Sequence, residues 1–254
     1  MNRKMKRNVI LGCFVSFFCL GGFVTTCNFD NKDGDMWSFI SRYREKWKQV
    51  GAVCPSSDQL AEAITCKIPD KEASANKDAS VSEPVHYLEV GAGTGSFTEY
   101  LVKNKLKKGD ILDAIEVDHD FCEILRKKFK NFPQVHIIEK SITDWNPDYT
   151  YKFIVSGLPF NSLPASLVKE VLAKYAQLIE KGGVISYFEY IGIASIREIF
   201  LRMISLFKDE KETNEYQKFL EIRKIVDEFT QKNVFEETSV FLNVPPARVF
   251  YLKF

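Results

Sequence analysis

Apolar and polar positions alternate in a regular way from residue 85 to the end of the chain. Short apolar runs predict five strands, and segments whose apolar residues recur every three or four positions predict helices between them. The expected strands are 85–90, 111–117, 135–139, 153–156 and 184–190. Residues 234–254 predict two more strands, joined at 244–247. We therefore expect an α/β fold with a mostly parallel, seven-stranded sheet flanked by helices, with an antiparallel C-terminal edge.

Several of the expected helices have recognisable ends and faces. Ser56, Ser57 or Asp58 can cap one early helix, and Asp118 can cap the helix after the second strand. Pro164 starts a further helix, which Gly182 and Gly183 are expected to end. The expected buried faces are Leu60, Ala61 and Ile64; Phe121, Ile124, Leu125 and Phe129; and Leu167, Val168, Val171, Leu172, Tyr175 and Leu178.

Residues 191–233 form a helical insertion in this scheme. Their apolar positions recur at helical spacing and include Ile196, Ile199, Phe200, Met203, Phe207, Tyr216, Phe219, Leu220, Ile225, Val226 and Phe229. Two interpretations remain open, namely a lid that faces the ligand and ordinary core packing.

The chain begins with a basic, then uncharged, segment. Four basic residues lie within residues 1–7, and residues 8–29 carry no charge. That length is close to the ~20 apolar residues that span a bilayer. A signal anchor is the favoured interpretation of residues 1–35. A cleaved export signal, a lipoprotein signal ending at Cys27 and a true start at Met36 are the alternatives.

Residues 36–68 are expected to form an N-terminal helical extension, followed by a flexible linker at 69–84. In 36–50, one helical stripe carries aromatic and aliphatic side chains with basic residues beside it. The stripe is Trp37, Ile40, Tyr43, Trp47 and Val50. Such a helix suits an anionic membrane surface, and docking on its own domain is the alternative.

Composition narrows the class of protein. The 254 residues are 45% hydrophobic and 27% charged, which excludes a disordered or collagen-like chain. Thirty-five basic against 34 acidic residues leave a net charge of +1, without the basic excess of many nucleic-acid binders. Six scattered cysteines and three separated histidines predict neither a disulfide framework nor a metal site.

A glycine-rich turn follows the first expected strand. Gly91, Gly93 and Gly95 allow a tight turn and a close approach to a ligand, and the next helix directs its first amides towards it. Ser96 stands where the dinucleotide-binding pattern has Gly or Ala. Glu116 lies 21 residues beyond Gly95, at the end of the second strand. A carboxylate there can accept both hydroxyls of a ribose, so the pair predicts a nucleoside site.

Two segments, LEVGAGTGSFT (88–98) and AIEVD (114–118), resemble class I S-adenosylmethionine-dependent methyltransferases, whose fold is Rossmann-like. Three more resemble the bacterial phospholipid N-methyltransferases, which methylate phosphatidylethanolamine: VGAVCPSSDQLA (50–61), VSGLPFNSLP (155–164) and NVPPARVF (243–250). That family is itself similar to the ribosomal RNA adenine dimethyltransferases.

The resemblance implies a cofactor, S-adenosyl-L-methionine, and a role for each matching residue. Its methionine part would lie among Glu89, Gly91, Ala92, Gly93 and Gly95. Glu116, with Val117 beside it, would hold the ribose, and Ser141 and Ile142 would lie near the adenine. Many relatives have an acidic residue where this chain has Ser141. Ser156, Gly157, Leu158 and Pro159 would border the methyl-transfer site.

The resemblance also implies a reaction, which is direct in-line transfer of the methyl group to a neutral amine. Tyr187, Glu189 and Tyr190 are candidates for accepting the amine proton or for orienting the amine. Packing is the alternative for all three. Arg248 is a candidate phosphate contact, with a surface ion pair as the alternative.

One tetrad separates lipid from RNA substrates. Adenine methyltransferases carry a motif of the N-x-P-[YF] kind, in which the Asn holds the amino group and the aromatic ring stacks on the base. Here the tetrad is Gly157-Leu158-Pro159-Phe160, so the side-chain acceptor is lacking and Phe160 remains able to stack.

We therefore expect a phosphatidylethanolamine N-methyltransferase that needs neither a metal nor a nucleic acid. A ribosomal RNA adenine N6-methyltransferase and a non-catalytic, membrane-associated nucleoside-binding protein are the alternatives. The positive-inside rule conflicts with a cytoplasmic catalytic domain if residues 9–27 span the membrane. We nevertheless expect a membrane-associated protein with its catalytic domain on the cytoplasmic side, where the cofactor is found.

Overall fold

The computed structural model describes residues 57–71, 83–191, 210–243 and 245–254, all within one compact unit, Trp37–Phe254. The predicted anchor at 8–29, the predicted membrane-binding helix at 36–50 and residues 192–209 of the insertion lie outside this part of the chain. None of the helices that the structure describes is both long enough and apolar enough to cross a bilayer.

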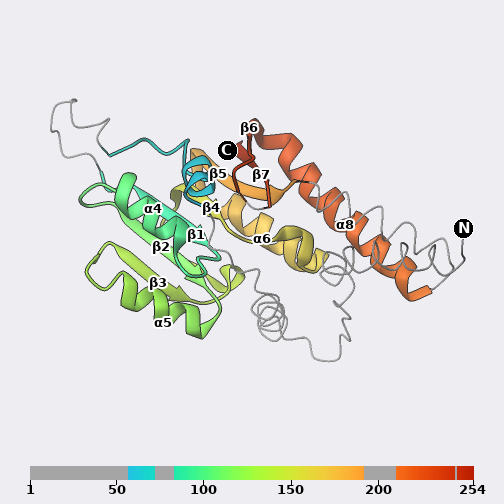
Figure 1. Ribbon diagram of the computed structural model, residues 1–254, viewed down its shortest axis with the longest axis horizontal. Helices are drawn as coiled ribbons and strands as arrows, with labels where there is room; N and C mark the ends of the chain where they lie inside the picture. The colour runs from blue at the N-terminus through green and yellow to red at the C-terminus, as the bar shows by residue number, and fades with distance from the viewer. Residues whose placement is uncertain (1–56, 72–82, 192–209, 244) are drawn as a thin grey trace, which may run out of the picture. The chain divides into compact units, whose positions relative to one another are not determined.

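Seven strands of the described residues form one sheet, in the order β3-β2-β1-β4-β5-β7-β6 (Figure 1). They are β1 (His86–Val90), β2 (Ile111–Glu116), β3 (Val135–Glu139), β4 (Tyr151–Ser156), β5 (Ile179–Tyr190), β6 (Val234–Val240) and β7 (Ala247–Lys253). The first five pair in parallel, whereas β7 is antiparallel to both β5 and β6. The predicted fold, including its antiparallel edge, is confirmed.

The helices alternate with these strands along the chain. They are α3 (Asp58–Ile64), α4 (Ser96–Asn104), α5 (His119–Lys128), α6 (Ala165–Leu178) and α8 (Glu210–Asn233), with short 3-10 turns η2 (Ile142–Asp144) and η3 (Phe160–Ser162). The strand order reverses between β1 and β4. In open α/β sheets, ligands bind at such a switch point, beyond the carboxyl ends of the strands.

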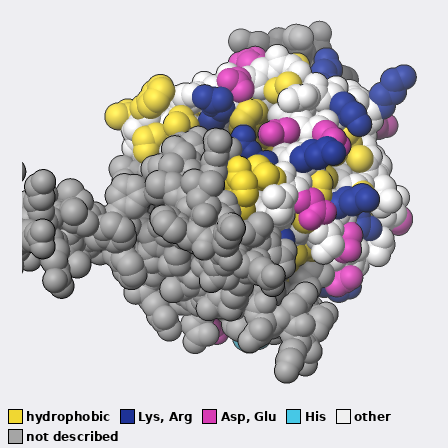
Figure 2. All heavy atoms as spheres, turned by 90° about the vertical axis from the view of Figure 1, so that its right-hand side faces the viewer, with side chains coloured by type: hydrophobic (Ala, Val, Ile, Leu, Met, Phe, Trp, Pro, Cys, Tyr) yellow, Lys and Arg dark blue, Asp and Glu magenta, His cyan; other side chains and the backbone are white. Residues whose placement is uncertain are grey.

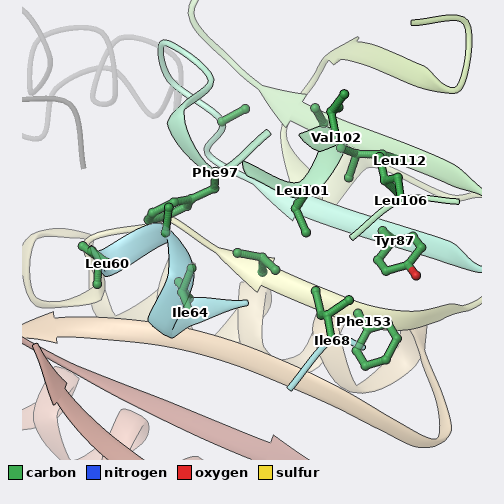
Figure 3. Close-up of a cluster of buried hydrophobic side chains, with 14 of the residues drawn as sticks. Leu60, Ile64, Ile68, Tyr87, Phe97, Leu101, Val102, Leu106, Leu112 and Phe153 are labelled. Atoms are coloured by element: carbon green, nitrogen blue, oxygen red, sulfur yellow. The ribbon is translucent and has the colours of Figure 1, made fainter. Parts of the chain in front are cut away.

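One face of the sheet is covered by α3 and α4. Their apolar side chains point towards one another and towards the strands (Figure 3). The residues labelled there are Leu60, Ile64, Ile68, Tyr87, Phe97, Leu101, Val102, Leu106, Leu112 and Phe153. As predicted, Leu60, Ala61 and Ile64 are buried, and Ser57 caps α3 by accepting a hydrogen bond from the Leu60 N–H.

The opposite face is covered by α6 and α8. The Tyr175 hydroxyl of α6 donates to Ser156 of β4, and the Tyr187 hydroxyl of β5 pairs with Thr230 of α8. The predicted α6 face is buried throughout. These contacts fix the strand ends that carry the candidate site.

Two details of the prediction are wrong. Ile124 of α5 is 44% exposed, and Cys122 is buried in its place. At about 100° per residue, Phe121, Cys122, Leu125 and Phe129 form one stripe, and Ile124 falls beside it. The two glycines do not end α6, which stops at Leu178 because Ile179 already pairs with Tyr151 of β4. Gly183 instead lies in β5, where an added Cβ would meet the Ile179 side chain at 2.7 Å.

Candidate active site

The glycine loop connects β1 to α4 at the carboxyl edge of the sheet. The N–H groups of Gly91 and Ala92 both donate to the Ile115 carbonyl of β2, at 2.8 and 3.2 Å. Gly95 has a φ of +83°, and a Cβ added there would lie 2.8 Å from the side chains of both Leu125 and Phe129. The backbone can therefore follow this path only because position 95 has no side chain.

Gly93 is the residue of the loop that faces open space. Its φ is +56°, and an added Cβ would meet no atom within 4 Å. The Gly93 N–H is nevertheless held, because it donates to Glu116 Oε2 at 2.8 Å. The loop is thus rigid on its inner side and open on its outer side, which is the geometry needed for close approach of a ligand.

Glu116 joins the end of β2 to this loop. Its Oε1 accepts hydrogen bonds from the N–H groups of Val117 and Asp118 at 2.6 and 2.9 Å, while Oε2 accepts from Gly93. The side chain is buried. The sequence predicted that this carboxylate and the glycines belong to one site, and the structure brings them into direct contact.

Glu89 places a second carboxyl group beneath the loop. Its Oε2 accepts a hydrogen bond from Thr98 Oγ1 of α4 at 2.7 Å, whereas Oε1 is buried and has no hydrogen-bond partner. Burial, with a smaller contribution from the Glu116 charge, raises the pKa of this carboxyl to about 8, although the hydrogen bond from Thr98 opposes the shift. A buried acceptor without a donor is costly in a folded protein and suits a ligand that brings a cation.

The two residues predicted near the adenine follow β3. Ser141 Oγ lies 2.8 Å from Thr143 Oγ1 and accepts from the Thr143 N–H, which caps η2. Both Ser141 and Ile142 are buried. β3 pairs with β2 so that Glu139 lies opposite Glu116, and Ser141 therefore follows at the same edge of the sheet.

The segment Ser156–Pro159 leaves β4 directly beside the glycine loop. The Gly157 N–H donates to the Val90 carbonyl at 2.8 Å, and a Cβ on Gly157 would lie 2.8 Å from the Gly91 carbonyl oxygen. Conversely, a Cβ on Gly91 would meet the Leu158 side chain at 3.0 Å. Position 157 therefore excludes side chains, because two backbone loops touch there.

The Ser156 hydroxyl fixes the start of this segment. It accepts hydrogen bonds from Tyr175 Oη at 2.8 Å and from the Leu158 N–H at 3.4 Å. Tyr175 is fully buried. The sequence predicted Tyr175 only as a packing residue, because apolar periodicity does not indicate where a hydroxyl group points.

We expect Tyr175→Phe to lower the free energy of unfolding by about 1 kcal/mol, because Ser156 then loses a buried donor. Ser156→Ala is expected to cost a similar amount, and the double variant less than the sum of the two. Urea unfolding of the four proteins measures this coupling. Additive losses would show that the two hydroxyls do not interact.

Tyr187 and Glu189 occupy β5 on the face covered by α8. Tyr187 is buried, pairs with Thr230 at 2.5 Å and stacks on the Phe250 ring at a centroid distance of 5.0 Å. Burial raises the pKa of its hydroxyl, which makes Tyr187 a poor proton acceptor and assigns it to the core.

Glu189 lies two residues nearer the carboxyl end of β5 and is half-buried. Within the described part of the chain, its carboxyl group has no hydrogen bond or ion pair. Burial raises the pKa of its carboxyl, and the charges of Arg223, Asp227 and Arg248 act on it. Arg248 lies opposite Glu189 on β7, and its guanidinium is 3.6 Å from Glu237. Of Tyr187 and Glu189, Glu189 is therefore the more available as a proton acceptor.

The three histidines lie apart, as the sequence indicates. His86 contacts the Tyr149 ring, His119 bonds Glu139, and His136 bonds Asp113. No group of three or more potential metal ligands occurs among the residues that the structure describes.

Comparison with known proteins shows similarity to methyltransferases. Residues 73–185 match the ribosomal RNA adenine dimethylase family. Ribosomal RNA small subunit methyltransferase A of Synechococcus sp. (strain JA-2-3B'a(2-13)) is 32% identical over 100 residues, which are 39% of this chain. The match spans only 34% of that enzyme's length.

A second relative matches a longer part of the chain. The ornithine lipid N-methyltransferase of Singulisphaera acidiphila is 23% identical over 182 residues, which cover 69% of this chain and 86% of the relative. Among solved structures, the N-methyltransferase NodS from Bradyrhizobium japonicum WM9, in complex with S-adenosyl-L-homocysteine, superposes with a TM-score of 0.50. It is 12% identical and covers 92% of this chain and 95% of its own, which shows a shared fold.

The fold, the glycine loop with its two carboxylates and these matches define a class I S-adenosylmethionine-dependent methyltransferase domain, with S-adenosyl-L-methionine as its cofactor. The site fits that cofactor, because Gly93 leaves room beside the loop and Glu89 offers an unpaired acceptor.

Proposed function

We propose that this protein is an N-methyltransferase that methylates the primary amine of a membrane lipid. Phosphatidylethanolamine is the expected substrate, and an ornithine lipid also presents a primary amine. The proposal rests chiefly on the tetrad that follows β4, where Gly157 replaces the Asn that binds a flipped adenine in RNA methyltransferases and the aromatic Phe160 is buried.

Gly157 stands at the position of the adenine-binding Asn. A Cβ added to Gly157 would lie 2.8 Å from the Gly91 carbonyl oxygen. Phe160 stands at the position of the stacking aromatic, yet it is only 2% exposed. Its ring packs against Tyr187 and Tyr175, at centroid distances of 5.5 and 6.4 Å. Both groups that would grip a planar base are thus missing or engaged, whereas a small aliphatic amine needs neither.

The extent of similarity supports the same substrate class. The match to the ornithine lipid N-methyltransferase runs over most of both chains, whereas the match to the adenine methyltransferase covers about a third of that enzyme. The charge distribution in Figure 2 also favours a lipid over RNA. Lys and Arg side chains lie interspersed with Asp and Glu over the described part of this face. A phosphate backbone favours a basic surface.

The chemistry required of the chain is modest. The cofactor supplies an electrophilic methyl group, and the lipid ammonium must lose a proton before its nitrogen has a lone pair to attack. The N–C bond then forms as the S–C bond breaks, and one proton is released for each methyl group. Glu89, Glu116 and the glycine loop would hold the cofactor, and the 156–159 segment would align the amine. Glu189 is the proposed proton acceptor.

The direct test is methyl transfer from isotopically labelled S-adenosylmethionine. Purified protein is incubated in parallel with vesicles of phosphatidylethanolamine, vesicles containing ornithine lipid, vesicles of phosphatidylcholine and ribosomal RNA. We expect label in phosphatidylethanolamine, with or without label in ornithine lipid. We expect no label in phosphatidylcholine or in ribosomal RNA. Label in RNA alone would establish the adenine methyltransferase instead, and label in no acceptor would reject both activities.

Glu189→Gln tests the proposed proton acceptor. We expect kcat to fall by about 100-fold, because general-base catalysis typically contributes that much, while the affinity for S-adenosylmethionine stays unchanged. The acidic limb of the kcat/KM profile against pH should also move towards the pKa of the lipid amine, because the variant can use only amine that is already neutral. Glu180→Gln is the matched control, since Glu180 lies at the other end of β5 and pairs with Lys152. An unchanged kcat in Glu189→Gln would remove Glu189 from the mechanism.

A further inference from the structure

Two adjacent side chains in the turn between β6 and β7 are unusually exposed. Phe241 and Leu242 are 73% and 76% exposed. The other exposed large hydrophobic residues of the described chain are Ile124, Phe132, Val234 and Phe235, and none exceeds 47%. Contiguous exposed apolar surface commonly marks a site of interaction with a partner or a membrane.

The turn lies at the same edge of the sheet as the candidate active site. β5 and β6 are both antiparallel to β7 and therefore run in the same direction. Across the three strands, Val240 lies opposite Ala247, which lies opposite Tyr190 at the end of β5. The turn thus extends beyond the carboxyl edge, where Ser156 and the glycine loop also lie.

The base of this turn is held firmly. Asn243 is buried, and its Oδ1 accepts hydrogen bonds from the Ser57 hydroxyl at 2.8 Å and the Ser57 N–H at 3.2 Å. Its Nδ2 donates to the Pro245 carbonyl at 2.7 Å, and the Ile191 N–H donates to the Pro246 carbonyl at 2.8 Å. A buried polar network therefore supports two outward-facing apolar side chains, so their exposure is part of a defined structure.

The chemistry of the turn favours a lipid surface over other occupants. Residues 238–247 include no charged side chain, so the turn itself offers nothing to a phosphate backbone. Pro245 and Pro246 have no N–H groups, which reduces the number of donors left unsatisfied in a medium without water. Phe and Leu are residues that amphipathic elements bury at the boundary between headgroups and acyl chains.

The adjoining sequence agrees with this occupant. Ser57, which bonds Asn243, is the first residue of the described chain. Six residues of sequence separate it from segment 36–50, whose basic and aromatic composition independently predicts membrane binding.

We propose that Phe241 and Leu242 insert into the headgroup–acyl boundary of the bilayer and so dock the catalytic edge of the sheet against the membrane. This inference rests on the proposed lipid substrate. Docking of the turn would explain how an amine at a membrane surface reaches a site at the carboxyl edge of the sheet.

The test is vesicle co-sedimentation of the full chain with Phe241→Ser/Leu242→Ser. With vesicles of phosphatidylethanolamine and phosphatidylglycerol, we expect the partition coefficient to fall by about tenfold or more, since two apolar side chains leave the lipid. Ile124→Ser/Phe132→Ser is the matched control, because it removes two exposed apolar side chains from α5 and the residues that follow it. The control should bind vesicles as the wild type does, and both variants should keep the wild-type affinity for S-adenosylmethionine.

Three results would overturn the inference. Unchanged vesicle binding of the 241/242 variant would show that the turn does not enter the bilayer. A lower free energy of unfolding would show that the two side chains pack against the chain itself. A change from dimer to monomer in light scattering, without a change in vesicle binding, would identify a second copy as the occupant.

A second substrate separates this inference from the proposed function. Short-chain phosphatidylethanolamine, held below its critical micelle concentration, reaches the site without a membrane. We expect the 241/242 variant to methylate this monomeric lipid at the wild-type rate and to lose activity on vesicles. If the wild type methylates neither form, the proposed function fails, whereas the co-sedimentation result still decides the role of the turn.

Discussion

Gly93→Leu is expected to weaken S-adenosylmethionine binding by at least about 100-fold, equivalent to roughly 3 kcal/mol. A Cβ added at position 93 meets no protein atom within 4 Å, so a side chain there extends into the space where the cofactor is expected. The fold should survive, although a non-glycine residue at a φ of +56° costs about 1–2 kcal/mol. Isothermal titration calorimetry measures the loss of affinity directly.

Gly109→Leu is the matched control for this substitution. Gly109 also has a positive φ, +99°, and also faces open space, but it precedes β2 at the opposite edge of the sheet. Its backbone strain should be at least comparable, while binding should remain as in the wild type. If Gly109→Leu lost affinity equally, or if Gly93→Leu bound normally, the loop would not be the cofactor site.

Glu89→Gln is expected to stabilise the protein at neutral pH and to weaken cofactor binding. Burial raises the pKa of Glu89 to about 8 in the folded state, above the ordinary value of 4.5. Between these two values the folded state holds a proton that the unfolded state has released, so wild-type stability falls as the pH rises. The slope from this group is at most about 1.4 kcal/mol per pH unit. Glutamine does not ionise, and the variant should lack this decline.

Urea unfolding at several pH values between 5 and 8 tests this expectation. The difference in unfolding free energy between Glu89→Gln and the wild type should grow with pH. Glu99→Gln serves as the control, because its lysine partners lower the pKa of Glu99 to about 2 and it does not titrate in this range. A difference between Glu89→Gln and the wild type that stays constant from pH 5 to 8 would contradict the assignment of the raised pKa.

Cofactor binding supplies an independent measurement on the same residue. The unpaired Oε1 of Glu89 is expected to meet a cation of the bound cofactor, and this favours the ionised carboxylate. Binding at pH 7 should therefore release protons, which calorimetry in buffers of different ionisation enthalpy detects. Glu89→Gln should release fewer protons and bind at least about tenfold more weakly. Equal proton release by both proteins would exclude this coupling.

Much of the architecture could be predicted from local pattern alone. The central strands β1 and β2 emerged within one residue of the predicted bounds, because a parallel strand buried on both faces differs from its helical neighbours in composition. The two glycines after α6 misled the prediction. A glycine pair favours a helix end as well as an irregular strand, and only the pairing of Ile179 with Tyr151 decides between them.

The candidate site likewise has features that the sequence could predict and features that it could not. Glu116 and the glycine loop could be joined from spacing, because parallel strands bring their carboxyl ends together. The engagement of Phe160 between Tyr175 and Tyr187 could not be predicted, since it depends on how η3, α6 and β5 pack against one another. Thr98 and Tyr175 were missed for the same reason. Their hydroxyl groups meet Glu89 and Ser156 only after α4 and α6 pack on the sheet.

A structure of the protein bound to S-adenosylhomocysteine is the measurement that bears most directly on the account. We expect the nucleoside beside the turn 91–95, with the ribose hydroxyls donating to Glu116 and the amino-acid part above Glu89. We expect the sulfur to face the Ser156–Pro159 segment, where the acceptor amine would approach. A nucleoside bound away from this loop, or a well-folded protein that takes up none of the compound, would contradict the assignment of the site and the methyl transfer built on it.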